Sequence, residues 1–173
     1  MKKYENLGLF VYESFISDQN HDVLVENIAK ELKTHTAEGY MDRNNVLRYG
    51  NKDMCENNHI SNEIPTYIDK VCDKLISDNI LKYKPNTINI NEYLKGDFIA
   101  PHIDRVASGP IVTILSLNSE AKMVFSNNKE TFELILLPKM LIQMKSVIRW
   151  HWRHSILPVE NTRYSVVFRS KNE

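Results

Sequence analysis

The chain has 173 residues, of which 42% are hydrophobic and 25% charged, and its 22 basic and 22 acidic side chains cancel to a net charge of zero. This balance predicts one compact domain and excludes a protein that coats nucleic acid through its overall charge. The sequence has no apolar run near the ~20 residues of a membrane span and no signal-peptide core, and its two cysteines, Cys55 and Cys72, are too few for a disulfide scaffold. We therefore expect a monomer that is intracellular and cytoplasmic and has no membrane partner.

The first half of the chain has the pattern of one short strand followed by two helices. Residues 7–12 are apolar and short enough for a strand. Ser17 and Asp18 offer an N-cap, and helical spacing follows at Val23, Leu24, Ile28 and Leu32. A second helix is predicted to open at Pro65, with an apolar face of Ile68, Val71, Cys72, Leu75 and Ile76.

The stretch from Asp42 to Glu63 separates these helices. It is polar, rich in Asn and without clear periodicity, and it is long for a connector, which indicates a functional loop. Within it, Arg43 and Arg48 could contact phosphate and Tyr49 could stack on a base. The alternative is an ordinary solvated loop.

From Thr87 onward the apolar pattern changes to a period of two, which is typical of strands. The predicted strands are Thr87–Tyr93, Phe98–Ile103, Ile111–Leu117, Lys122–Ser126, Phe132–Leu136, Leu141–Met144, Val147–Ile156 and Arg163–Phe168. The expected fold is α+β, a double-stranded β-helix (jelly-roll) core with N-terminal helices packed outside. We expect a single domain over 1–173, with the helices and the loop in 1–86 and the catalytic core in 87–173.

Two histidines and an aspartate are candidate metal ligands. His102 and Asp104 are two residues apart, so a strand would aim both into the barrel. A simple buried His-Asp hydrogen bond is the alternative. Among the late histidines, strand alternation places His154 inward with the tryptophans and His151 outward with Arg149. Two histidines and one carboxylate on one face are the ligand set of non-haem Fe(II) oxygenases.

A pair of arginines predicts an anion site beside this metal site. Arg163 and Arg169 are six residues apart, so a strand would place both guanidinium groups, with Ser165 between them, on one face. Two inward arginines are costly to bury without anions, and a dicarboxylate would pair with both. On an earlier strand, Asn91 and Tyr93 share a face and could hydrogen-bond the same carboxylates.

Together these motifs resemble the AlkB family of 2-oxoglutarate- and Fe(II)-dependent dioxygenases. The resemblance is carried by Asn91-x-Tyr93-x-x-Gly96, His102-x-Asp104, His154-x-Ile156 and Arg163-x5-Arg169. Residues 9–32 are similar to the opening strand and helix of the family, and 48–50 to its Arg/Phe/Tyr-Gly segment. Residues 84–102, 116–125 and 137–149 are most similar to the branch that hydroxylates modified wobble uridines in tRNA.

The resemblance implies a role for each residue of the motifs. It implies Fe(II) as the metal, bound by His102, Asp104 and His154, with 2-oxoglutarate and O2 as co-substrates. Arg163 and Tyr93 would bind the distal carboxylate of 2-oxoglutarate. Arg169 and Asn91 would bind the end nearer the metal. Ser165 stands where some members have Asn and would contribute a weaker hydrogen bond.

The expected activity is hydroxylation or demethylation of a modified nucleotide, in RNA rather than DNA, with a tRNA wobble uridine as the expected target. Substrate contacts are expected from Arg43, Arg48 and Tyr49 of the loop and from Arg149 on the outward face of the late strand. Three alternatives remain: a demethylase that repairs alkylated DNA or RNA, an oxygenase acting on protein, and a catalytically silent nucleic-acid-binding module.

Overall fold

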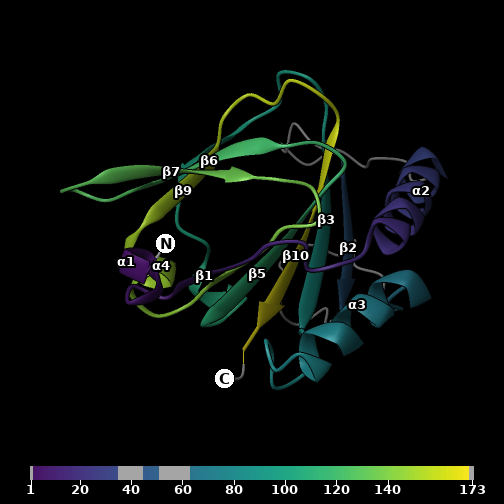
Figure 1. Cartoon of the computed structure of the whole chain (residues 1–173), viewed down its shortest axis with the longest axis horizontal. Helices are drawn as coiled ribbons and strands as arrows, with labels where there is room; N and C mark the ends of the chain where they lie inside the picture. Colours follow the sequence, from purple (N-terminus) through teal and green to yellow (C-terminus); the bar gives the residue numbers. More distant parts are fainter. Residues whose placement is uncertain (1, 35–44, 51–62, 172–173) are drawn as a thin grey trace.

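The protein, described here from a computed structural model, is built around two antiparallel sheets. The structure describes residues 2–34, 45–50 and 63–171. The six-stranded sheet contains, in spatial order, β1 (Leu9–Tyr12), β8 (Leu141–Met144), β5 (Ile111–Leu117), β10 (Arg163–Ser170), β3 (Thr87–Tyr93) and β2 (Val46–Gly50). The four-stranded sheet contains β4 (Ile99–His102), β9 (Arg153–Ile156), β6 (Ala121–Ser126) and β7 (Thr131–Leu136). The two sheets face each other as the layers of a jelly roll (Figure 1).

The N-terminal helices lie outside this sandwich. α2 (Asp18–Thr34) and α3 (Thr66–Ser77) cover the outer face of the larger sheet near β3 and β2 (Figure 1). Most residues expected on their apolar faces are buried in one cluster that joins the helices to the sheet: Leu24, Ile28, Leu32, Ile68, Val71, Cys72, Leu75, Ile88, Ile90, Val166 and Phe168. Val23, which helical spacing placed on the apolar face of α2, is 47% exposed instead. The predicted fold class, α+β with a jelly-roll core and external helices, is confirmed.

Strand alternation divides β10 between two environments. Val166 and Phe168 belong to the core under the helices, whereas Val167 belongs to the core between the sheets. Arg163, Ser165 and Arg169 share the inner face with Val167, as the period of two predicted. The space between the sheets therefore receives polar side chains from a central strand.

The prediction of one strand over 147–156 is wrong. Residues Ser146–His151 form a short helix, α4, and only Arg153–Ile156 form a strand, β9. The backbone amide of Ile148 donates to the carbonyl of Leu7, and that of Lys145 donates to Gly8. These tertiary bonds hold the turn of helix although Val147, Ile148 and Trp150 favour strands. Two other short helices were also not predicted, α1 (Lys2–Glu5) and the 3-10 turn η2 (Val106–Ser108).

The stretch from Asp42 to Glu63 was predicted to be a loop, but part of it is a strand. β2 occupies Val46–Gly50 and pairs with β3 at the edge of the larger sheet. Residues 42–44 and 51–62 lie outside the described residues. The apolar residues Val46, Leu47 and Tyr49 were the available signal for this strand. No helix among the described ranges is long and apolar enough to cross a membrane.

A hydrogen-bonded cluster anchors β2 to the helices. The phenol groups of Tyr49 and Tyr67 donate to the two carboxylate oxygens of Glu31, so β2, α3 and α2 meet at one side chain. Burial and the neighbouring Glu31 raise the pKa of both phenols, so both remain protonated donors at neutral pH. This cluster fixes the edge strand without a contribution from the space between the sheets.

Removing one of these donors is expected to destabilise the protein. Tyr67→Phe leaves one Glu31 oxygen without its partner, so the free energy of unfolding in urea should fall by about 1–3 kcal/mol. The matched control is Tyr83→Phe, because Tyr83 is 49% exposed and its replacement should change stability by less than ~0.5 kcal/mol. Equal urea midpoints for Tyr67→Phe and wild type would contradict the stabilising role of the cluster.

Candidate metal and dicarboxylate site

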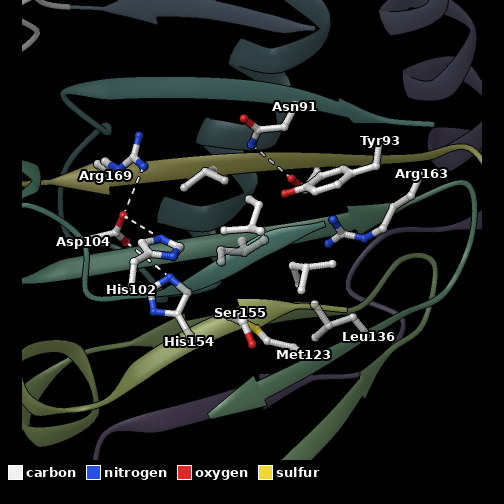
Figure 2. A pocket seen from close by; sticks show the side chains of 15 residues that line it. Asn91, Tyr93, His102, Asp104, Met123, Leu136, His154, Ser155, Arg163 and Arg169 are labelled. Carbon is white, nitrogen blue, oxygen red and sulfur yellow. Dashed lines mark hydrogen bonds and ion pairs between the residues drawn. The ribbon is translucent and has the colours of Figure 1, made fainter. Parts of the chain in front are cut away.

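A pocket lies between the inner faces of the two sheets. One end carries imidazole and carboxylate groups, and the other carries the Arg163 guanidinium beside the Tyr93 ring (Figure 2). The wall between the two ends is apolar and comprises Ile99, Ile114, Met123, Leu136, Ile156 and Val167. The pocket is therefore polar at both ends and hydrophobic along its length.

Three candidate metal ligands meet at the first end. One ligand atom each from His102, Asp104 and His154 lie within 4.8 Å of one another, and each Nε2 atom is 3.9 Å from an Asp104 carboxylate oxygen. The Nδ1 atom of His102 is 2.9 Å from the carbonyl oxygen of Ala100. This carbonyl is an acceptor, so Nδ1 carries the proton and the Nε2 lone pair faces the cluster.

Strand pairing explains how these ligands come together. His102 ends β4 and lies opposite His154 of β9, whereas Asp104 follows two residues after β4 has ended. The sequence interpretation of His102 and Asp104 on one continuous strand is therefore corrected: the carboxylate is presented by a loop. His151 lies at the exposed end of α4 and is not part of the cluster.

The charges around the cluster keep its carboxylate ionised. Burial alone would raise the pKa of the Asp104 carboxyl, but nearby positive charge, chiefly that of Arg169, outweighs burial and holds that pKa below its ordinary value. Burial lowers the pKa of His154 to about 4. At neutral pH the carboxylate is thus charged and the imidazole of His154 is neutral, which are the states that ligate metals.

At the opposite end, Arg163 is a buried cation with an unused donor. Its side chain is 1% exposed, its Nε donates to Ser116 Oγ at 3.2 Å, and its guanidinium lies 4.8 Å from the centre of the Tyr93 ring. Its Nη1 has no hydrogen-bond partner. Burial lowers the pKa of Arg163, and within the described part of the chain it forms no ion pair. The site fits a carboxylate, which would accept from the unpaired Nη1.

Arg169 belongs to the central strand β10 and lies at the metal end of the pocket, beside Asp104 (Figure 2). Its Nη2 is 3.3 Å from an Asp104 carboxylate oxygen, and its Nη1 donates at 2.7 Å to Asn89 when that amide is oriented with oxygen toward it. The Nε of Arg169 is buried without a partner. Nearby, Asn91 Nδ2 donates to Ser165 Oγ at 3.2 Å. The structure thus brings together all eight residues that the sequence predicted for the metal and the dicarboxylate.

Two residues of this site were missed by the sequence reasoning. Asn89 binds Arg169, and Ser116 binds Arg163. Asn89 precedes Asn91 by two residues on β3, so strand alternation could have predicted that both lie on the same face. Ser116 lies in a strand that is buried throughout, so no alternation marked its inner face.

The predicted substrate contacts are only partly in place. Arg43 lies outside the described residues. Tyr49 is 4% exposed and bonded to Glu31 on the helix side of the sheet, so the prediction that it stacks on a base is wrong. Arg149 is 2% exposed, so the prediction that it lies on an outward face is also wrong, because it belongs to α4 instead of a strand. Arg48 is half-buried and lies opposite Asn89, on the pocket face of β2.

A jelly roll with a cluster of two histidines and one aspartate is the architecture of a metal-dependent oxygenase. The family model for the 2OG-Fe(II) oxygenase superfamily matches residues 13–169, and the chain belongs to this superfamily. It is an enzyme, and the superfamily implies Fe(II), 2-oxoglutarate and O2, as predicted. The catalytically silent module is thereby set aside.

Two relatives are similar in sequence to most of this chain. Uncharacterized protein L905 of Acanthamoeba polyphaga mimivirus is 32% identical over 98% of this chain and 88% of its own length. The tRNA (carboxymethyluridine(34)-5-O)-methyltransferase alkbh8 of Xenopus tropicalis is 26% identical over 87% of this chain. This match covers 25% of alkbh8, so the chain spans about a quarter of that relative.

Solved structures show the same fold at low sequence identity. A prolyl-4-hydroxylase from Pseudomonas putida superposes with a TM-score of 0.69 at 13% identity, covering 99% of this chain and 97% of its own. OsALKBH1 superposes with a TM-score of 0.69 at 14% identity, covering 94% of this chain and 98% of its own. These likenesses show that the fold is shared.

The unused donor of Arg163 has a consequence for stability. In Arg163→Met a flexible apolar chain replaces a buried cation that lacks an anion, so the free energy of unfolding of the ligand-free protein should rise by about 1 kcal/mol. The control Arg153→Met removes an exposed arginine and should change it by less than ~0.5 kcal/mol. Urea denaturation measures both, and a loss of ~2 kcal/mol or more in Arg163→Met would mean that the protein itself satisfies Arg163.

Proposed function

We propose that this enzyme hydroxylates a modified nucleotide in RNA, with Fe(II) held by His102, Asp104 and His154. The observation that carries the catalytic part is the placement of this cluster across one pocket from Arg163, a buried arginine whose Nη1 has no hydrogen-bond partner. An ion at the cluster would neutralise the Asp104 carboxylate and take the free Nε2 atoms of the two imidazoles.

For 2-oxoglutarate we propose an orientation along the pocket. Arg163 and Tyr93 would hold the distal carboxylate, because the Arg163 guanidinium lies beside the Tyr93 ring and keeps its Nη1 without a partner. Arg169 and Asn91 would hold the end nearer the metal, with Ser165 fixing the Asn91 amide. The apolar wall between them would pack against the methylene groups of the co-substrate.

When bound, the iron supplies the activation of O2, with one oxygen atom oxidising 2-oxoglutarate to succinate and CO2 and the other entering a C–H bond of the substrate. The chain's own residues bind, orient and exclude water. Arg169 is placed to keep Asp104 ionised, and the buried wall keeps water away from the reacting centre.

For the substrate class, we infer RNA from two observations. The alkbh8 relative is by name a tRNA methyltransferase, and this chain matches a quarter of it. In addition, Arg48 projects a positive charge from the edge strand onto the pocket face, where a phosphate could lie. Unstacked bases of an anticodon loop would enter the pocket without the cost of opening a duplex.

Loss of a metal ligand should abolish binding and turnover together. We expect His102→Ala and Asp104→Ala each to weaken Fe(II) affinity by more than ~100-fold, measured by anaerobic calorimetry, and to stop succinate formation. The control is His151→Ala, because His151 is exposed at the end of α4. Wild-type Fe(II) affinity in either ligand variant would overturn the assignment of the metal site.

The RNA proposal is tested by the choice of substrate. A tRNA anticodon loop with a modified uridine should be consumed faster than duplex DNA with a methylated base, as measured by mass spectrometry of the nucleosides. Arg48→Gln should raise KM for the tRNA and reduce the slope of log KM against log salt by about 0.7, the value for one lost contact to a single strand.

Two outcomes would contradict this proposal. Faster turnover of duplex DNA would favour alkylation repair. If neither nucleic acid changes while 2-oxoglutarate is still consumed, an oxygenase acting on protein becomes the better assignment. Neither outcome affects membership of the superfamily.

A further inference from the structure

Arg149 is buried beneath the segment that carries Asp104 but does not line the pocket. Its guanidinium donates to three backbone carbonyl oxygens: from Nε to Gly109 at 3.0 Å, from Nη1 to Asp104 at 3.1 Å and from Nη2 to Arg105 at 2.8 Å. The guanidinium carbon also lies 4.3 Å from the centre of the Trp150 ring. One side chain of α4 therefore binds both ends of the segment 104–109.

This segment has few other anchors. Asp104 lies beyond the end of β4, so the strand ladder does not hold its backbone. The residues that follow face solvent, and Val106 is 80% exposed. At the other end of the segment, Gly109 packs closely against the backbone of Ser170. Its φ is +83°, and an added Cβ would lie 2.2 Å from the Ser170 carbonyl oxygen. Between these points, the Arg149 guanidinium binds the backbone of the segment, whereas Arg169 contacts the Asp104 carboxylate itself at 3.3 Å.

We propose that Arg149 is a positioning residue that holds the Asp104 carboxylate toward His102 and His154 by fixing the backbone on both sides of the turn. The proposal rests on the metal site of the preceding section and adds a requirement to it. It also assigns Arg149 a role different from the substrate contact that the sequence suggested.

The geometry requires a guanidinium. A planar fork offers five N–H donors in fixed directions, which is how one side chain reaches three carbonyl oxygens. A lysine ammonium at the same place keeps the charge but cannot span all three acceptors. Arg149→Lys therefore separates the loss of the fork from the loss of the charge, and Arg149→Met removes both.

The first measurement is metal affinity, with Co(II) alone as an air-stable probe followed by calorimetry and by its visible absorption bands. Arg149→Met should weaken Co(II) binding by about 10- to 100-fold, the range for loss of a residue that orients a ligand. Arg149→Lys should lie between this variant and wild type, and the absorption bands of both should shift because the carboxylate has moved. The matched control is Arg153→Met, which removes an exposed arginine whose Nη1 lies 3.4 Å from the Pro101 carbonyl oxygen.

The second measurement is hydrogen exchange in metal-free protein. In wild type the backbone amide of Ser108 donates to the carbonyl oxygen of Arg105, and that of Gly109 donates to the carbonyl oxygen of Val106. In both Arg149 variants, exchange over 104–109 should become at least ~10-fold faster while exchange in β3 stays at the wild-type rate. A residue needed only for general stability would accelerate exchange in β3 as well.

The outcomes distinguish a failure of the positioning role of Arg149 from a failure of the metal site itself. If Asp104→Ala loses Co(II) while Arg149→Met keeps wild-type affinity and exchange, the positioning role is wrong and the metal site stands. If Asp104→Ala itself keeps wild-type affinity, the metal site is wrong and the positioning role falls with it. Should Arg149→Met fail to fold, Arg149→Lys decides, because wild-type values in both measurements would overturn the proposal.

Discussion

A positive charge buried without an anion is the constraint on which this structure depends. Arg163 is enclosed between the two sheets, keeps one donor unpaired and has no carboxylate partner among the described residues. Such a charge is costly to bury, so the surrounding packing must supply the stability that the site lowers. The helices on the outer face and the apolar wall of the pocket provide that packing. A carboxylate is the group that would complete the contacts of this guanidinium.

The two ends of the pocket handle charge in opposite ways. At one end the Arg163 cation is left uncompensated, whereas at the other the Asp104 carboxylate is surrounded by Arg169 and two imidazoles. Arg169, at the Asp104 end, keeps one donor unpaired as well. A ligand with a carboxylate at each end and a metal cation at the cluster would complete both sets of contacts. The apolar wall sets the distance between them.

The pocket and the edge strand come from different halves of the chain. The residues proposed for the metal and the dicarboxylate come from β3, β4, β9 and β10 and from the loop after β4, all in the second half. The edge strand β2 comes from the first half, and the Glu31 cluster ties it to the helices. The jelly roll itself is shared with a prolyl-4-hydroxylase and with OsALKBH1 at low sequence identity, so the fold alone does not assign a substrate.

Local periodicity by itself determined the two helices, most strands, and the shared inner face of Arg163, Ser165 and Arg169, because a period of two or 3.6 is written in neighbouring residues. Tertiary structure decided the rest. His154 meets His102 by pairing across β4 and β9, although the strand begins only at Arg153. Arg149 turned inward because carbonyl groups of Leu7 and Gly8 hold α4 as a helix. Contacts between residues this far apart in the sequence leave no local pattern, so only the folded chain could reveal them.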